Sequence, residues 1–147
     1  MRWGLAIVLA ISTTGLPSSV LAQATTASST AARDIDAIVK PILDALIRSD
    51  AKGVVDTFVA KSPLMAGKTM ELTNLQAQIQ NGLTLYGKIS DFDLAQEQIY
   101  GTSAVRRYYV AAHANLNTRW EFIFSRTSKG WVVAYMGFED QQRTWFK

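Results

Sequence analysis

Residues 106–109, which read RRYY, are the part of this 147-residue sequence whose side chains could do the most distinctive chemistry. Successive side chains of a β-strand point to opposite faces, so each face here would carry one arginine and one tyrosine. An inward-facing Arg106 with Tyr108 would give a pocket a charged donor and a hydroxyl, which suits a ligand with a carboxylate. The alternative is a cross-strand contact, in which an arginine stacks on Trp120 or pairs with Glu121.

His113 is the only histidine of the chain and lies on the same predicted strand. Alternation places it on one face with Tyr109 and Ala111 and puts Tyr108 on the other, but does not say which face meets a pocket. No acidic residue or second histidine lies beside it in the sequence, so a metal site or a catalytic triad has little support. We favour a structural or surface histidine over one that lines a pocket.

Asp91 and Asp93 are two residues apart and would share one face of a strand, together with Glu97 if that strand stays regular. Paired carboxylates can act as general acid and base when their surroundings push their pKa values apart. The reading that we favour is a solvated strand edge, whose charges discourage aggregation.

Motifs of the commoner catalytic and cofactor sites are absent from the sequence. It has no glycine-rich phosphate loop, no serine or cysteine in a nucleophile motif, and no metal-ligand spacing. We therefore predict no metal and no cofactor, and we assign no catalytic residue. The candidate ligand-binding residues are Arg106, Tyr108, Trp120, His113 and Asp91.

These candidates lie in a segment whose apolar residues alternate, as in antiparallel strands. A first strand bends or bulges near Gln96, and a second covers about 103–116. A hairpin joins 120–125 to 131–136, because aromatic residues alternate on both sides of a glycine-containing turn. A ligand could enter the interior only if side chains such as Phe122, Phe124 and Trp131 leave room for it.

Helical periodicity precedes the strands. Apolar residues spaced by three and four predict a helix from Asp34, with Pro41 inside it. Asp50 can cap a second helix, and a third begins at Thr69 or Thr73 and stops at Gly87. The apolar positions expected to be buried are Val54, Val55 and Phe58 in the second helix and Leu72, Leu75, Ile79 and Leu83 in the third.

The first 22 residues resemble a secretory signal peptide. Arg2 supplies positive charge, residues 5–11 form an apolar core, and small residues lead to an expected cleavage after Ala22. An uncleaved anchor is disfavoured because a spanning helix needs about 20 consecutive apolar residues, and residues 12–15 interrupt the run. We expect a flexible linker over 23–33, one domain over 34–140 and an aromatic tail over 141–147.

The net charge and the absence of cysteine restrict the partners, the covalent modifications and the cellular location that we expect. The chain has no cysteine, so it carries no disulfide, no thiolate zinc site and no lipid-modified cysteine. The net charge of +3 includes Arg2, and the basic residues are scattered among acids. So small a charge argues against nucleic acid and against a membrane surface after cleavage. We expect a protein of the bacterial periplasm or external medium.

Two segments resemble the nuclear transport factor 2-like, or cystatin-like, superfamily. LDALIRSDAKGVVDTF, residues 43–58, is similar to its opening helices, and RWEFIFSRTSKGWVVAYMGFED, residues 119–140, is similar to its closing hairpin. The resemblance extends over 34–140. It implies an α+β cone in which a curved antiparallel sheet wraps around helices and an internal pocket, often with dimerisation through the sheet. The superfamily includes ketosteroid isomerase-like and polyketide cyclase-like enzymes and many members without known activity.

Fold carries little information about function. Our leading expectation is a non-catalytic exported domain that binds a small apolar or acidic molecule, or a partner protein, through its pocket or sheet face. One alternative is a small lyase or isomerase that uses a pocket carboxylate, or His113 with Tyr108. Another is a structural subunit, such as a homodimer, that self-associates through the tail over 141–147.

Overall fold

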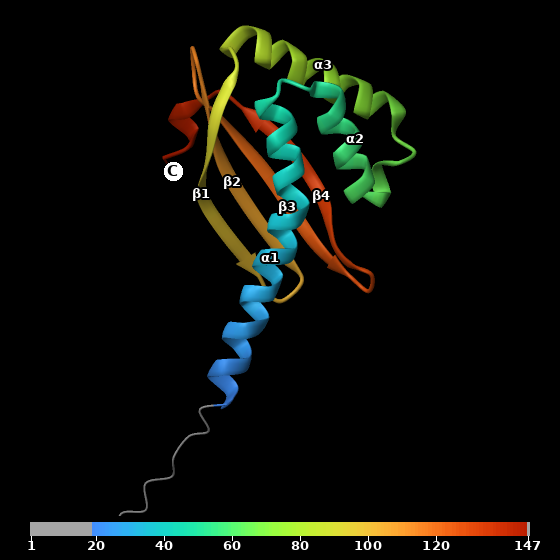
Figure 1. Ribbon diagram of the computed structural model, residues 1–147, viewed down its shortest axis with the longest axis vertical. Coiled ribbons are helices and arrows are strands. Elements are labelled where there is room, and N and C mark those ends of the chain that lie inside the picture. The colour runs from blue at the N-terminus through green and yellow to red at the C-terminus, as the bar shows by residue number, and fades with distance from the viewer. Residues whose placement is uncertain (1–18, 147) are drawn as a thin grey trace, which may run out of the picture.

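The computed structural model describes the backbone of residues 19–146 and the side chains from Ser29 to Phe146. Three α-helices come first and four β-strands follow, which confirms the predicted α+β order. The elements are α1 (Ser19–Ile47), α2 (Ala51–Lys61), α3 (Thr69–Tyr86), β1 (Ile89–Tyr100), β2 (Ala104–His113), β3 (Thr118–Thr127) and β4 (Gly130–Glu139), with short 3-10 helices η1 (Pro63–Met65) and η2 (Gln142–Thr144). The three α-helices lie over one face of the sheet (Figure 1).

The strands form one antiparallel sheet in the order β1-β2-β3-β4, so each strand pairs with its neighbour in the chain. The register of β1 on β2 shifts between Leu94 and Gln96, which confirms the bulge predicted near Gln96. A second irregularity lies in β4, where Ala134 is skipped in the pairing with β3. Bulges bend a strand and add twist, and the sheet curves around the helices (Figure 1).

Aromatic side chains fill the centre of the space between sheet and helices. Phe122 and Phe124 are fully buried, and their ring centroids lie 6.2 Å apart. Tyr109 packs edge-on against Phe122 at 5.8 Å, and Trp120 is buried with its ring stacked on Phe138. The predicted alternation along β3 is confirmed. Phe122 and Phe124 thus occupy the interior in which we considered a ligand, so that location is excluded and any pocket must lie away from this centre.

Helix α1 places an apolar face against the sheet and contacts β1 and β4. Its buried positions follow the predicted spacing of three and four and include Ile35, Ile42 and Leu46. The helix begins at Ser19, well before the start expected at Asp34, and extends beyond the sheet (Figure 1). Alanine and glutamine have good helix propensity, so the segment expected to be a linker is compatible with the helix that it forms here.

The predicted signal peptide lies mostly outside the described residues, because these begin at Ser19. The cleavage point after Ala22 falls within α1 and stays a prediction. In the part of the chain described by the structure, no helix combines the length and apolar character needed to cross a bilayer.

The boundaries of α2 and α3 follow local sequence signals. The Gly53 N–H donates a 2.8 Å hydrogen bond to the Asp50 carboxylate, which confirms the predicted cap of α2. Helix α3 begins at Thr69, one of the two predicted starts, and ends at Gly87, whose φ of 88° favours glycine. The expected apolar faces are confirmed, with Val54, Val55, Phe58, Ile79 and Leu83 buried and Leu72 and Leu75 half-buried.

The C-terminal tail folds back onto the sheet. The Thr144 hydroxyl donates to the Glu139 carboxylate at 3.1 Å, and the Trp145 ring centroid lies 5.8 Å from the guanidinium carbon of Arg119. Phe146 remains 88% exposed. Of the aromatic residues at the end of the chain, Trp145 thus has a partner within its own domain.

Candidate functional site

Strand β2 divides the RRYY segment between the two faces of the sheet. Arg107 and Tyr109 face the helices and are 3% and 6% exposed, whereas Arg106 and Tyr108 lie on the opposite face. One arginine and one tyrosine therefore reach each face, as alternation predicts. The inward pair is Arg107 with Tyr109, and not the pair Arg106 with Tyr108 that we considered for a pocket.

Arg107 joins three elements through its guanidinium. Nη1 lies 2.5 Å from Asp36 Oδ1 on α1, and Nε lies 2.6 Å from Glu97 Oε2 on β1. Nη1 also donates to the Tyr109 hydroxyl at 3.2 Å. A buried cation needs such partners, because an unpaired charge away from water is costly. We call these four residues the Arg107 cluster.

The surroundings of the Arg107 cluster shift two pKa values. Burial lowers the pKa of Arg107, but the hydrogen bonds to Asp36, Glu97 and Tyr109 raise it, and the net direction is upward. Burial raises the pKa of Tyr109, against the opposing effect of the hydrogen bond from Arg107. The guanidinium is therefore charged and the phenol neutral near pH 7. Two carboxylates and one guanidinium give the cluster a formal net charge of −1.

A pocket of about 160 Å³ lies beside this cluster, at the end of the sheet where the β1–β2 and β3–β4 turns meet α1. We call it the end pocket. Its wall is mainly apolar and includes Ile35 from α1, Ile99 and Val105 from β1 and β2, and Trp131 from β4. Ala31 and Ala32 of α1 add two short apolar side chains to the wall, and Thr102 lies in the β1–β2 turn.

Two of the described residues that line the end pocket are charged, and they come from different strands. Glu97 of β1 is the carboxylate held by Arg107, so the pocket touches the Arg107 cluster. Arg126, near the end of β3, lies directly opposite Trp131 in the β3–β4 ladder. Paired residues point to the same side of a sheet, which places both side chains at the pocket.

His113 lies away from the end pocket and joins the end of α3 to the sheet. Its Nδ1 is 2.7 Å from the Gly87 carbonyl oxygen, and its Nε2 is 2.9 Å from Thr118 Oγ1. Trp120 Nε1 donates to the same threonine oxygen at 3.0 Å. The Thr118 hydroxyl can then donate to Nε2, while Nδ1–H donates to Gly87. This arrangement satisfies both ring nitrogens and indicates a structural role.

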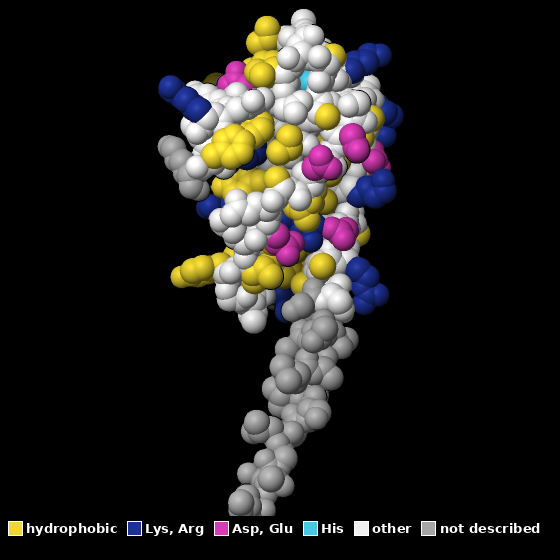
Figure 2. All heavy atoms as spheres, turned by 90° about the vertical axis from the view of Figure 1, so that its left-hand side faces the viewer, with side chains coloured by type: hydrophobic (Ala, Val, Ile, Leu, Met, Phe, Trp, Pro, Cys, Tyr) yellow, Lys and Arg dark blue, Asp and Glu magenta, His cyan; other side chains and the backbone are white. Residues whose placement is uncertain are grey.

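The candidate carboxylates of β1 and the candidate Trp120 also lie away from the end pocket. Asp91 and Asp93 are exposed on β1, which is an edge strand. Figure 2 looks onto the β1 side of the molecule and shows carboxylates interspersed with apolar side chains. Charge on an exposed edge opposes strand pairing between molecules. Trp120 is 2% exposed in the core.

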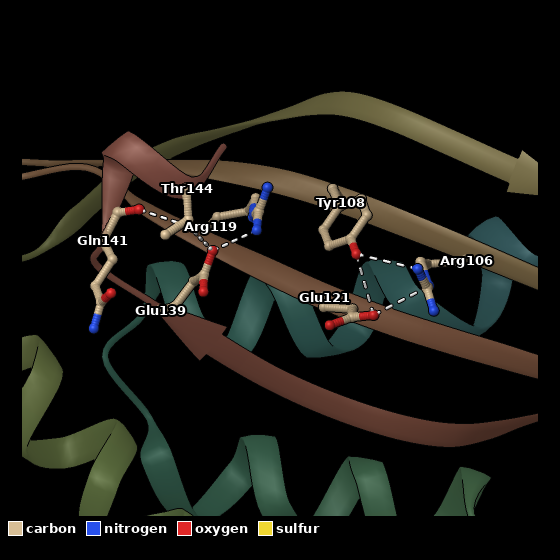
Figure 3. A network of polar contacts seen from close by, with 7 residues as sticks. All are labelled: Arg106, Tyr108, Arg119, Glu121, Glu139, Gln141 and Thr144. Carbon is tan, nitrogen blue, oxygen red and sulfur yellow. Dashed lines mark hydrogen bonds and ion pairs between the residues drawn. The ribbon is translucent and has the colours of Figure 1, made fainter. Parts of the chain in front are cut away.

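On the face of the sheet that points away from the helices, an ion pair holds the remaining arginine of the RRYY segment and a hydrogen bond holds the remaining tyrosine. Arg106 Nε lies 3.2 Å from Glu121 Oε1, and the Tyr108 hydroxyl donates to the same oxygen at 3.4 Å (Figure 3). Arg119 pairs with Glu139 in the same network and lies over the Tyr108 ring. This is the cross-strand pairing with Glu121 that we considered as the alternative to a ligand role.

The structure thus does not bring the five candidate residues to one site: Arg106 and Tyr108 share the outer face of the sheet, His113 and Trp120 share the Thr118 hydroxyl, and Asp91 lies on the β1 edge. The end pocket is formed by other residues. Arg126 was missed, and Glu97 and Trp131 were considered only as an edge carboxylate and a core side chain. The hairpin contained part of the missing signal: its two-residue turn at 128–129 pairs Thr127 with Gly130 and Arg126 with Trp131, which gives the arginine an aromatic neighbour. Among the described residues, no cluster of three or more histidines and carboxylates could hold a metal ion.

Comparison with known proteins identifies the fold. A candidate NTF2-like transpeptidase from Campylobacter jejuni is similar with a TM-score of 0.51 and 16% identity, and the match covers 67% of this chain and 94% of that one. A domain of unknown function with a cystatin-like fold from Nostoc punctiforme gives a TM-score of 0.48 and 10% identity, covering 76% and 80%. No family model and no curated protein matches the chain. The chain has the α+β fold of the nuclear transport factor 2-like proteins.

Proposed function

We propose that this chain binds a small, mainly apolar molecule in the end pocket. The observation that carries the proposal is the hollow of about 160 Å³, walled by apolar side chains of α1, β1, β2 and β4. Ligand sites in proteins are typically concave and apolar, with a few polar groups that fix orientation. Glu97 and Arg126 are such groups here.

The Arg107 cluster supports this proposal because it braces the pocket wall. Asp36 is adjacent to Ile35, a wall residue, and is tied through Arg107 to Glu97, another wall residue. This connection holds α1 against β1 on the inner side of the pocket. A wall that is already ordered binds a ligand with a smaller loss of conformational entropy.

Catalysis has less support than binding. Of the described residues, Glu97 is the one carboxylate that lines the end pocket, and its Oε2 already accepts a hydrogen bond from Arg107. Tyr108 lies on the opposite face of the sheet, and both nitrogens of His113 are engaged elsewhere. The groups of the lyase or isomerase hypothesis therefore do not converge on one space.

We also propose that the protein works outside the cytoplasm, in the periplasm or the external medium of a bacterium. Support comes from the charge, apolar core and small residues of the first 22 positions. Amino-terminal sequencing of the protein recovered from the producing cells should find Gln23 as its first residue. A mature protein that retains Met1 would contradict export with cleavage.

The binding proposal can be tested with 2-phenylethanol, a neutral molecule with one aromatic ring. We expect a saturable NMR shift of the Trp131 indole N–H and of the Gly101 and Thr102 amides, which lie at the end pocket. The Trp120 indole N–H donates to Thr118 in the core, so its chemical shift should not change and serves as an internal control. Absence of a saturable shift up to about 10 mM would contradict the proposal, since it would leave an affinity too weak for a specific site.

A further inference from the structure

We propose, building on the binding function above, that the end pocket selects small aromatic monocarboxylates and that Arg126 holds their carboxylate. Three features of the described residues support this: the size of the pocket, the hydrogen-bond and ion-pair partners of its two charged wall residues, and the contact between the end of β3 and the β1–β2 turn.

The volume of the end pocket suits a ligand of about one ring. The pocket measures about 160 Å³, and an apolar protein cavity of about 150 Å³ is known to accommodate benzene. Trp131, Ile35 and Val105 give the wall flat and branched apolar surfaces. A single aromatic ring with a short polar substituent matches this space, whereas a fused polycyclic molecule does not.

The two charged wall residues differ in what they can offer to a ligand. Glu97 Oε2 already accepts a hydrogen bond from Arg107 at 2.6 Å, so the charge of this carboxylate is partly offset by a guanidinium and only its other oxygen is left for an ammonium ligand. Arg126 has an exposed side chain and, in the described range 29–146, forms no ion pair. A guanidinium can bind a carboxylate through two parallel hydrogen bonds. The free charge at the pocket is therefore positive.

The position of Arg126 is fixed by the backbone. Its N–H donates to the Ser103 carbonyl oxygen at 2.8 Å, which ties the end of β3 to the β1–β2 turn. The same contact brings Arg126 close to Thr102, a wall residue whose hydroxyl can donate a further hydrogen bond. Trp131 faces Arg126 across the hairpin. A carboxylate at Arg126 would leave the ring of the ligand beside the indole.

A second carboxylate on the ligand would be unfavourable. The other side of the pocket ends at Glu97, which belongs to the Arg107 cluster with its net charge of −1. Like charges within a few ångströms repel each other, most of all where water is partly excluded. The pocket is therefore positive at one side and negative at the other, which favours one carboxylate over two.

Three ligands of nearly the same shape test this inference: phenylacetate, 2-phenylethanol and phenethylamine, with charges of −1, 0 and +1 at pH 7. Affinities would be measured by NMR titration of the Trp131 indole N–H. We expect phenylacetate to bind about five- to tenfold more tightly than 2-phenylethanol, and phenethylamine more weakly than both. Raising the salt concentration should reduce the advantage of the carboxylate, because Arg126 is exposed.

Two variants with the same change in net charge identify the residue responsible. Arg126→Gln should lower the affinity for phenylacetate to that of 2-phenylethanol, whereas Lys129→Gln, on the adjacent turn, should leave it unchanged. Arg126→Lys should retain part of the preference, because it keeps the charge but loses the planar fork. Circular dichroism would check that each variant is folded.

The outcomes separate this inference from the binding function. If 2-phenylethanol binds and phenylacetate binds no more tightly, the carboxylate preference is wrong while the pocket remains a binding site. Tightest binding of phenethylamine, or equal losses in the Arg126→Gln and Lys129→Gln variants, would also overturn the inference. If none of the three ligands shifts the Trp131 signal, the binding function itself fails and the inference fails with it.

Discussion

Arg107 of β2 and Asp36 of α1 meet across the interface between sheet and helix, with 2.5 Å between Nη1 and Oδ1. The two residues are 71 positions apart in the chain. Asp36 is 63% exposed at its side chain, whereas Arg107 is 4% exposed. The pair thus connects a buried cation to a solvated carboxylate, and it fixes α1 next to the end pocket.

Replacing Arg107 should destabilise the protein much more than replacing its neighbour Arg106. Arg107→Met should lower the free energy of unfolding by about 2 kcal/mol, because Glu97 and Tyr109 lose a buried partner while Asp36 stays solvated. Arg106→Met should cost no more than about 0.5 kcal/mol, because the Arg106 side chain is 44% exposed and its pair with Glu121 is therefore reached by water. Urea unfolding measures both. Equal losses in the two variants would contradict the assigned orientation of the strand.

The buried phenol of Tyr109 should make stability depend on pH in the alkaline range. Its pKa is raised by burial, whereas a tyrosine in an unfolded chain titrates near pH 10. Above about pH 10 the folded state therefore binds more protons than the unfolded state, and stability falls as the pH rises toward the folded pKa. Below about pH 10 this contribution is constant.

Tyr109→Phe should weaken that alkaline decline, measured by urea unfolding at about pH 8 and pH 10.5. Tyr86 also has a raised pKa, mainly through its hydrogen bond to Asp140, so the comparison belongs in a Tyr86→Phe background. An identical decline with and without Tyr109 would show that its phenol titrates as in the unfolded chain.

Loss of His113 should reduce stability and leave ligand binding intact. His113→Ala removes the partner of the Gly87 carbonyl and of the Thr118 hydroxyl, and we expect a cost of about 1–2 kcal/mol. Because His113 does not line the end pocket, the affinity for 2-phenylethanol should change by less than about twofold. A large loss of affinity in a folded variant would instead place His113 in the site.

Deletion of residues 141–147 should destabilise the domain without changing its oligomeric state in solution. Trp145 packs against Arg119, and Thr144 donates to Glu139, so the tail has intramolecular partners. We expect a loss of about 1 kcal/mol for these partly buried contacts. Light scattering would report the mass. A dimer that dissociates on deletion would support the alternative of a self-associating subunit.

The hairpin, the helix boundaries and the bulge could be predicted because their signals are local. Asp50 caps a helix three residues before Gly53, and Gly87 stops one in a conformation with positive φ. The alternation of Trp120, Phe122 and Phe124 determines which side of β3 is buried. Such signals depend on residues a few positions apart, which a single sequence displays.

The orientation of β2 could not be predicted, because its two faces are nearly alike in composition. One face carries Val105, Arg107, Tyr109 and Ala111, and the other carries Arg106, Tyr108, Val110 and Ala112. Alternation shows which residues share a face, but hydrophobicity does not choose between two such sets. The choice depends on Asp36 and Glu97, which come from other elements and satisfy the buried guanidinium.

The end pocket could not be predicted for a related reason: its wall comes from α1, from all four strands and from the β1–β2 turn. Ala31 and Ala32 lie in the segment of small residues, 23–33, that we expected to be a flexible linker. They become a pocket wall only because α1 continues through that segment. Arg126 is recognised as a possible ligand contact only when the strand register, which places Trp131 opposite it, is known.

The most direct test of the end pocket as a ligand site is to fill it and measure 2-phenylethanol binding. Ala32→Phe places a ring at the pocket wall, and Ala37→Phe places the same ring on an exposed position of the same helix. We predict that Ala32→Phe lowers the affinity more than about tenfold and that Ala37→Phe leaves it unchanged. Equal affinities of folded Ala32→Phe and the parent protein would contradict the account, because the ligand would then bind elsewhere.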